Sequence, residues 1–261
     1  VNPGEVGING GTSCTNELVA RGVPARDKAD YMVEISPSGD YIVENYIASG
    51  GSALMRWYKD NFGGYEVQQA AAEDRNVWEV IYGQATEAPI GNRGLMLVPY
   101  FQGANGPFWD LHARGIISGL HTEQGRPHLV RAIIEGLAYE SRREGELMAA
   151  GSGTQIELIK MYGGSAKSDV WNQTFADIFN RPLQVAETAE TTALGAAISA
   201  AVGTGMHADF RSAVDAMVNL AQVYQPIPAN VATYDRYYEV YCDLFKNLQD
   251  CHRRIAAIND A

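Results

Sequence analysis

Cysteine is scarce in this chain of 261 residues, and its three copies are Cys14, Cys242 and Cys251. An odd number of cysteines with no C-x-x-C spacing and no paired histidine argues against a disulfide framework, a cysteine metal site and a redox motif. We therefore expect free thiols and a cytoplasmic protein, because the cytosol keeps such thiols reduced.

Positive charge is also in short supply. The chain has 20 Lys and Arg against 31 Asp and Glu, which gives a formal net charge of −11. Nucleic acids and anionic membrane surfaces bind basic faces, so this balance argues against both as partners. It does not argue against an anionic small ligand, because backbone N–H groups can bind one inside an acidic protein.

Long apolar runs, a signal peptide and an initiator methionine are absent as well. No run approaches the length that spans a bilayer, so we expect no membrane span. The chain starts at Val1, and its opening, VNPGEVGINGGTS, looks like the middle of a fold, so we expect a segment of a longer protein. With 46% hydrophobic residues, no internal repeat and no low-complexity linker, residues 1–261 are expected to form one domain.

Familiar functional motifs are missing too. The stretch GGSAKS lacks the spacing of a Walker A loop, and neither GSGTQI nor GTGMHA fits G-x-G-x-x-G. The histidines have no metal-ligand spacing, and no Ser/His/Asp set can be chosen from spacing alone; they are His112, His121, His128, His207 and His252. The chemistry must therefore be sought in less specific patterns.

Alternating and helical apolar spacing predicts the order of elements. Two strands joined by a Gly-rich turn are expected over 5–19. A hairpin is expected over 31–47 with its turn at Pro37–Asp40, and further strands at 94–103, 156–162 and 182–186. Helices are expected from near Ser49–Ser52 to Gly63–Gly64, over 76–85, after Pro127, over 168–179 and over 191–205, with two more between 209 and 258. We expect Ser168 to cap one helix, and Thr191 or Thr192 with Gly203 to cap another.

Three glycine-rich turns could place backbone N–H groups against a ligand. They are Gly10–Ser13 between two strands, Gly50–Ser52 before a helix, and Gly163–Ser165 between a strand and a helix. A strand-to-helix junction offers N–H groups and the positive end of the helix dipole, and glycine lets a ligand touch the backbone. Taken singly, Gly10–Ser13 and Gly50–Ser52 are more typical of an ordinary turn or helix cap, whereas Gly163–Ser165 is equally compatible with a tight turn and a ligand site. Pro107–Asp110 is more typical of a structural loop packed on the core.

The order of these stretches is more informative than any one of them. GGTS, SGGSALMRW, PYFQGANGPFWDLHARGIISGL, LVRAIIEGLAYESR, YGGSAKSDVWNQTFADIFNRPLQV and ETTALGAAISAAVGTG follow one another along the chain. Together they resemble the C-terminal half of the FGGY carbohydrate kinases, which include xylulokinases, ribulokinases, fuculokinases and glycerol kinases. The resemblance covers nearly the whole chain and is densest over residues 94–205.

The resemblance implies an α/β fold, an actin-like ATPase (ribonuclease H-like) domain with a mixed sheet flanked by helices. It implies that this domain holds most of the ATP, with Mg²⁺, opposite a sugar-binding domain. The residues implied to line the ATP site are Gly11, Thr12 and Ser13 in a phosphate loop, Gly51 and Ser52 at a helix start, and Gly163, Gly164, Ser165 and Ser168 on the adenosine side. Arg56 falls near a nucleotide-contacting position, and the TALGAA helix is implied to be structural.

The family's first phosphate loop, sugar-binding residues and catalytic Asp precede the GTS loop, outside this sequence. We therefore predict that the chain has no catalytic residue of its own, and that it is the nucleotide-binding half of a kinase, inactive alone. Xylulose or another ketopentose is the expected acceptor, and the N-terminal domain and a second copy are the expected partners. The alternatives are another actin-like ATPase module, or an interaction domain of the same fold without chemistry.

Overall fold

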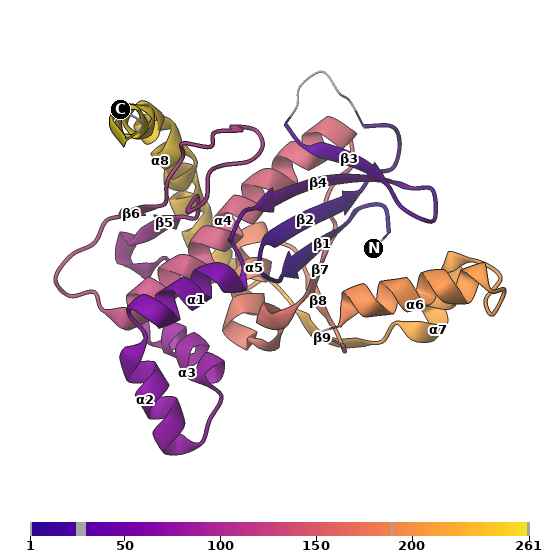
Figure 1. Ribbon diagram of the computed structural model, residues 1–261, viewed down its shortest axis with the longest axis horizontal. Coiled ribbons are helices and arrows are strands. Elements are labelled where there is room, and N and C mark those ends of the chain that lie inside the picture. Colours follow the sequence, from indigo (N-terminus) through magenta and orange to yellow (C-terminus); the bar gives the residue numbers. More distant parts are fainter. Residues whose placement is uncertain (1, 25–29, 189, 260–261) are drawn as a thin grey trace.

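A mixed seven-stranded sheet forms the centre of the molecule (Figure 1). The computed structural model describes residues 2–24, 30–188 and 190–259. The strand order is β3-β4-β2-β1-β7-β8-β9, in which β1, β7 and β8 run parallel and the other pairs are antiparallel. The strands are β1 (Glu5–Gly10), β2 (Cys14–Val19), β3 (Met32–Ile35), β4 (Tyr41–Ile47), β7 (Leu158–Tyr162), β8 (Leu183–Ala186) and β9 (Leu220–Tyr224). The expected mixed α/β sheet is confirmed.

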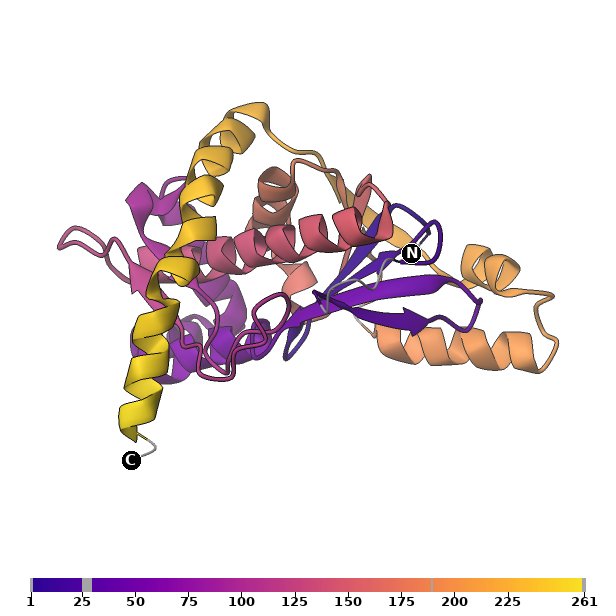
Figure 2. The same cartoon turned by 90° about the horizontal axis from the view of Figure 1, so that it is seen from above.

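Helices cover the two faces of this sheet unequally (Figure 2). The long α4 (Arg126–Ser152) and α5 (Asp169–Phe179) pack on one face, and α8 (Pro228–Asn259) packs on them from outside. Of the helices in the described residues, α6 (Thr191–Gly203) and α7 (Phe210–Met217) lie on the other face. The remaining elements extend one end: α1 (Ser52–Asn61), α2 (Gly64–Glu73), α3 (Val77–Gln84), the 3-10 turns η1 (Ala85–Glu87) and η2 (Asn92–Gly94), and a small sheet of β5 (Met96–Val98) and β6 (Ile116–Ser118).

The period-two alternation of the strands explains which face holds the core. Val6 and Ile8 of β1, with Leu18 of β2 and Val43 of β4, are fully buried, and α4 packs against β2 and β4. Their neighbours on the opposite face are only half-buried and include charged side chains such as Glu17 and Glu44. Successive side chains point to opposite sides of a strand. The alternation of apolar and polar residues therefore gives the sheet one fully buried face and one partly covered face.

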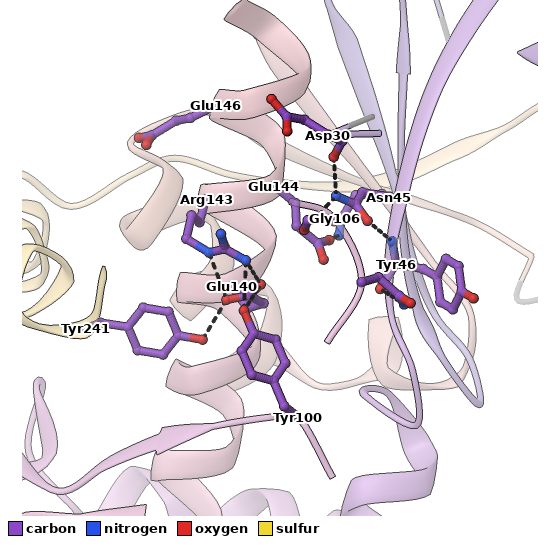
Figure 3. A network of polar contacts seen from close by, with 12 residues as sticks. Asp30, Asn45, Tyr46, Tyr100, Gly106, Glu140, Arg143, Glu144, Glu146 and Tyr241 are labelled. Carbon is purple, nitrogen blue, oxygen red and sulfur yellow. Dashed lines mark hydrogen bonds and ion pairs between the residues drawn. The ribbon is translucent and has the colours of Figure 1, made fainter. Parts of the chain in front are cut away.

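A buried polar layer fixes α4 against its neighbours (Figure 3). Glu140 of α4 pairs with Arg143, and it accepts hydrogen bonds from the hydroxyls of Tyr100 (2.7 Å) and Tyr241 (2.9 Å). Nearby, Asn16 of β2 donates to Glu144 at 2.5 Å. Burial, with Glu140 close by, holds the pKa of Glu144 well above its usual range. These bonds connect β2, α4, α8 and the segment after β5, so the scaffold behind the sheet is specified by polar as well as apolar contacts.

Most expected elements are present, and several details were wrong. The strand expected at 94–103 is only Met96–Val98 (β5), and its partner β6 was not predicted. The N-cap of α6 is Glu190, without a side-chain capping bond, and its C-cap is Thr204, so neither the threonines nor Gly203 fill those positions. Gly64 does not end a helix but begins α2, which was not predicted. The tail contains not only α7 and α8 but also β9, an edge strand that pairs with β8. Val1 lies outside the described residues.

Candidate functional site

Two of the glycine turns meet at one edge of the sheet. Strands β1 and β7 are parallel neighbours, with Asn9 opposite Tyr162, so the turns that follow them emerge side by side. The Ser165 hydroxyl donates to the carbonyl of Gly10 at 3.2 Å. A Cβ on Gly10 would lie 1.6 Å from Ser165 Oγ, so the close approach of the turns requires glycine there.

The third glycine turn, Gly50–Ser52, is hydrogen-bonded to the first, Gly10–Ser13. The N–H groups of Gly51 and Ser52, at the start of α1, donate to the carbonyls of Thr12 (3.2 Å) and Gly11 (2.6 Å). A Cβ on Gly51 would lie 2.0 Å from the Gly11 carbonyl oxygen. Because N–H and C=O point in opposite directions across a trans peptide, the N–H groups of Thr12 and Ser13 face away from α1. The loop thus presents donors on its open side, as an anion-binding loop requires.

Gly163 and Gly164 have different surroundings although they are adjacent. Gly163 has φ +86°, and a Cβ there would lie 2.7 Å from Asn9 Oδ1 and 3.0 Å from the carbonyl carbon of Gly10. A Cβ on Gly164 would meet nothing within 4 Å. Gly163 is therefore required by the packing of the turns, whereas Gly164 borders open space.

That open space is a cavity of about 470 Å³ between α3 and the β7–α5 turn. It is within the size range of small-molecule sites. Its lining residues are Ser52, Asn76, Trp78, Glu79, Tyr82, Gly83, Thr86, Gly164, Ser165, Lys167, Ser168, Asp169 and Val170. The side chains come from the start of α1, one face of α3, the 3-10 turn η3 (Gly164–Lys167) and the first turn of α5.

An aromatic pair gives the cavity an apolar wall. Trp78 and Tyr82 are four residues apart on α3, so they lie on the same helix face, and their ring centroids are 6.4 Å apart. Tyr82 also packs edge-on against the buried Trp171 of α5 at 6.0 Å. Burial raises the pKa of Tyr82 to about 12, so its hydroxyl stays neutral. A flat ring system suits such a wall, and the exposed charged residues Glu79, Lys167 and Asp169 also line the cavity.

Comparison with known proteins decides the family. Residues 6–204 match the sequence model of the family described as "FGGY family of carbohydrate kinases, C-terminal domain". The chain belongs to this family. A gluconokinase of Bacillus subtilis is 26% identical over 98% of the chain and 50% of its own length. A xylulose kinase of Staphylococcus epidermidis is 31% identical over 80% of the chain and 40% of its own length.

The solved structures agree with the expected actin-like ATPase fold. The ligand-bound xylulose kinase of Lactobacillus acidophilus superposes with a TM-score of 0.83 and 24% identity, over 97% of this chain and 49% of that one. The chain spans about half the length of the curated relatives it matches.

The structure gathers most of the predicted ATP-site residues. Ser52, Gly164, Ser165 and Ser168 line the cavity itself. Four other predicted residues belong to the adjoining loops: Gly11, Ser13, Gly51 and Gly163. Thr12 is exposed in the same loop, and Arg56 is exposed on α1 but does not line the cavity.

Sequence reasoning missed the α3 side of the cavity. The segment 76–85 was expected to be helical, but Asn76, Trp78, Tyr82 and Thr86 were not connected to a ligand. The signal available was the i, i+4 aromatic pair, which is equally typical of a core-facing helix. The Pro107–Asp110 loop has the expected packing role, since Phe108 packs edge-on against Tyr100 and Phe245.

The remaining titratable groups do not form a second centre in the described chain. Among residues 2–24, 30–188 and 190–259, no three His, Cys, Asp or Glu side chains are placed to hold a metal ion. Cys14 is buried beside Ser141, and burial raises the pKa of its thiol to about 12. That thiol is therefore protonated and unreactive. Within the same residues no helix is long and apolar enough to cross a membrane.

Ser168 has a structural role that can be measured separately. As the predicted N-cap of α5, its Oγ accepts a hydrogen bond from the Trp171 N–H at 3.4 Å. We expect Ser168→Ala to lower the free energy of unfolding by about 1 kcal/mol, measured by urea denaturation. Ser168→Thr keeps the capping oxygen and is expected to restore most of that loss. An unchanged stability in the alanine variant would contradict the capping role.

Proposed function

We propose that this chain is the nucleotide-binding domain, over residues 1–261, of an ATP-dependent carbohydrate kinase. The main support for the proposal is the 470 Å³ cavity, which is lined on one side by the β7–α5 turn and on the other by the aromatic face of α3. Family membership makes a nucleotide the first ligand to consider, and the cavity suits one in size and lining. The domain is proposed to work in the cytoplasm, for which its free thiols are suited.

The residues present fit an adenine nucleotide. Trp78 and Tyr82 would pack on the base, and the bare backbone at Gly164 admits it closely. The N–H groups of the 11–13 loop would bind phosphate oxygens, with the hydroxyls of Thr12 and Ser13 beside them. Mg²⁺ commonly binds through phosphates and one or two carboxylates, so it needs no three-ligand cluster in this chain.

Phosphoryl transfer needs an aligned donor, a metal ion and a base at the acceptor hydroxyl. ATP supplies the transferable γ-phosphate, and the residues of this chain bind and orient the donor. We propose that the base and the sugar-binding groups belong to the half of the relatives' length that this chain does not span. The 261 residues alone are then inactive.

The acceptor is proposed to be a sugar or polyol. A ketopentose such as xylulose is our first candidate, because a xylulose kinase is among the relatives; a gluconokinase is among them as well. The test is to assay the longer protein, with its preceding half, against pentuloses, aldonates and polyols with ATP. ATP-dependent phosphorylation of one substrate by the longer protein, and none by the 261 residues, is the expected result. A longer protein that phosphorylates none of them would contradict the proposal.

Trp78 offers a direct test of the base pocket. Base–aromatic stacking contributes about 1–3 kcal/mol per base, so Trp78→Ala is expected to raise the Kd for ATP by about 5- to 100-fold. Isothermal titration calorimetry of the folded variant measures this change. The matched control is Tyr65→Ala, which removes an aromatic ring on α2 outside this cavity. Equal effects of the two substitutions would contradict a stacking role for Trp78.

A further inference from the structure

A second cavity lies on the neighbouring face of α3, between this helix, α2 and the start of α4. Its volume is about 380 Å³, which is within the range of small-molecule sites. Helices α2 and α3 lie together at one end of the molecule (Figure 1). Glu79 and Gly83 line both this α2–α3 cavity and the 470 Å³ cavity, so α3 is a wall that the two cavities share.

A buried side chain in the lining of the α2–α3 cavity has an unpaired oxygen. Gln84 is 8% exposed, and its Nε2 donates to Oε1 of the fully buried Glu66 at 2.7 Å. In the described part of the chain, Oε1 of Gln84 and Oε2 of Glu66 have no hydrogen-bond partner. Buried acceptors are rarely left unpaired, because an unmade hydrogen bond there is costly. A ligand that donates hydrogen bonds would satisfy Gln84.

The charged residues of this lining balance one another. Arg75 and Arg126 are present with Glu79 and Glu87, and all four are exposed. Two guanidinium groups and two carboxylates give the lining both donors and acceptors without a net charge that would select an ion. A hydroxyl group both donates and accepts, so a neutral molecule with several hydroxyls matches this set of side chains.

An aromatic ring on α2 also belongs to the lining. Tyr65 is 56% exposed, and the Arg126 guanidinium lies over its ring at 4.5 Å from the centroid. Nε of Arg126 donates to the buried Glu66 at 2.8 Å, which fixes the guanidinium beside the ring. A lining that combines an aromatic ring with a few placed polar groups is typical of small-molecule sites, and the ring suits the C–H groups of a polyhydroxylated ligand.

We propose that the α2–α3 cavity is an effector site for a neutral polyhydroxylated molecule, a sugar or a polyol, whose binding strengthens nucleotide binding through α3. The ligand bridges α2, α3 and the start of α4, and so holds α3 in position. Trp78 and Tyr82, the aromatic wall of the nucleotide cavity, belong to the same eight-residue helix. Such coupling between two sites is reciprocal. Only the coupling rests on the proposed function; binding of the polyol does not.

The first test is a ligand-observed NMR titration of ribitol and of D-glucose into the folded 261-residue chain without nucleotide. Saturable binding of one of these probes with millimolar affinity is expected. Gln84→Met replaces the amide by an apolar chain of similar length and is expected to raise the Kd by about 3- to 10-fold. The exposed Glu87→Ala, which leaves the Gln84–Glu66 pair intact, is expected to raise it by about 2- to 5-fold.

The matched control is Asp243→Ala, which removes an exposed carboxylate on α8 that lines neither cavity. It should bind the probe as the parent does. Polyols also stabilise proteins by exclusion from their surfaces, but that effect is not saturable and is common to all variants. A folded chain that binds neither probe saturably, or equal affinity in the parent and both cavity variants, would overturn the proposal.

The second test measures the Kd for ATP with and without a saturating concentration of the probe. In the parent chain the probe is expected to lower the Kd for ATP by at least about 5-fold, and ATP should lower the Kd for the probe by the same factor. In Gln84→Met and Glu87→Ala the ratio of the two ATP Kd values should fall toward 1 at the same probe concentration, whereas Asp243→Ala should keep the parent ratio. A ratio of 1 in the parent would overturn the coupling.

The two measurements keep this proposal distinguishable from the proposed function. A chain that binds the probe, with the expected loss in Gln84→Met, but binds neither ATP nor ADP supports the effector cavity and contradicts the nucleotide site. A chain that binds ATP but neither probe contradicts the effector cavity alone.

Discussion

Gly164→Val is expected to weaken ATP binding by about 10- to 100-fold while the chain stays folded. A Cβ at this position would meet nothing within 4 Å, because it points into the cavity. The backbone of Gly164 has no positive φ that a branched residue would resist. The valine methyl groups would therefore occupy ligand space, and their effect on the protein's own packing would be small.

The measurement is a calorimetric titration of the variant, together with its Tm. The matched control is Gly64→Val, since Gly64 also has no atom within 4 Å of a Cβ but lies at the start of α2, outside the cavity. We expect the control to bind ATP as the parent does. If Gly164→Val lost stability and affinity together, Gly164 would be a structural turn residue and the cavity would not be the binding site.

Gly163→Val is expected to have the opposite profile, with a loss of about 3–6 kcal/mol in the free energy of unfolding. The backbone at Gly163 has φ +86° and ψ −175°, a region that essentially only glycine occupies. A Cβ there would also collide with Asn9 and with the backbone of Gly10 and Gly11. Strain and collision act on the same junction between β1 and β7.

Urea denaturation and thermal unfolding measure this effect. A loss of this size is a large share of the typical stability of a domain, so a fall in Tm of about 6–20 °C is expected. Gly163→Ala adds fewer atoms but keeps the same strained backbone, so its Tm should lie between those of the parent and the valine variant. A Gly163→Val protein with unchanged Tm would show that the two turns do not pack as described.

The sequence was sufficient to predict the framework of the site. Strands and turns that depend on local alternation and glycine, such as 5–19 and 162–168, were predicted correctly, and so was the Ser168 cap. The resemblance to the family placed the three loops together, which no spacing rule does by itself. The ligand roles of the individual loop residues remain predictions.

The parts that sequence reasoning missed depend on distant partners. Strand β9 is mostly exposed, and it is a strand because β8 pairs with it. Helix α2 begins at a Gly-Gly pair that locally resembles a helix end. Trp78 and Tyr82 have the spacing of a core face, and they line a cavity only because the β7–α5 turn leaves space opposite them. In all three cases the outcome depends on which distant segments pack together, and local sequence propensity does not encode that.

The most direct measurement is a calorimetric titration of ATP and ADP into the folded 261-residue chain. The account predicts saturable binding at one site, with micromolar to millimolar affinity, that Gly164→Val and Trp78→Ala weaken and that Gly64→Val and Tyr65→Ala leave unchanged. A chain that gives the circular dichroism and cooperative unfolding of a folded domain, yet binds neither nucleotide at millimolar concentration, would contradict the central claim.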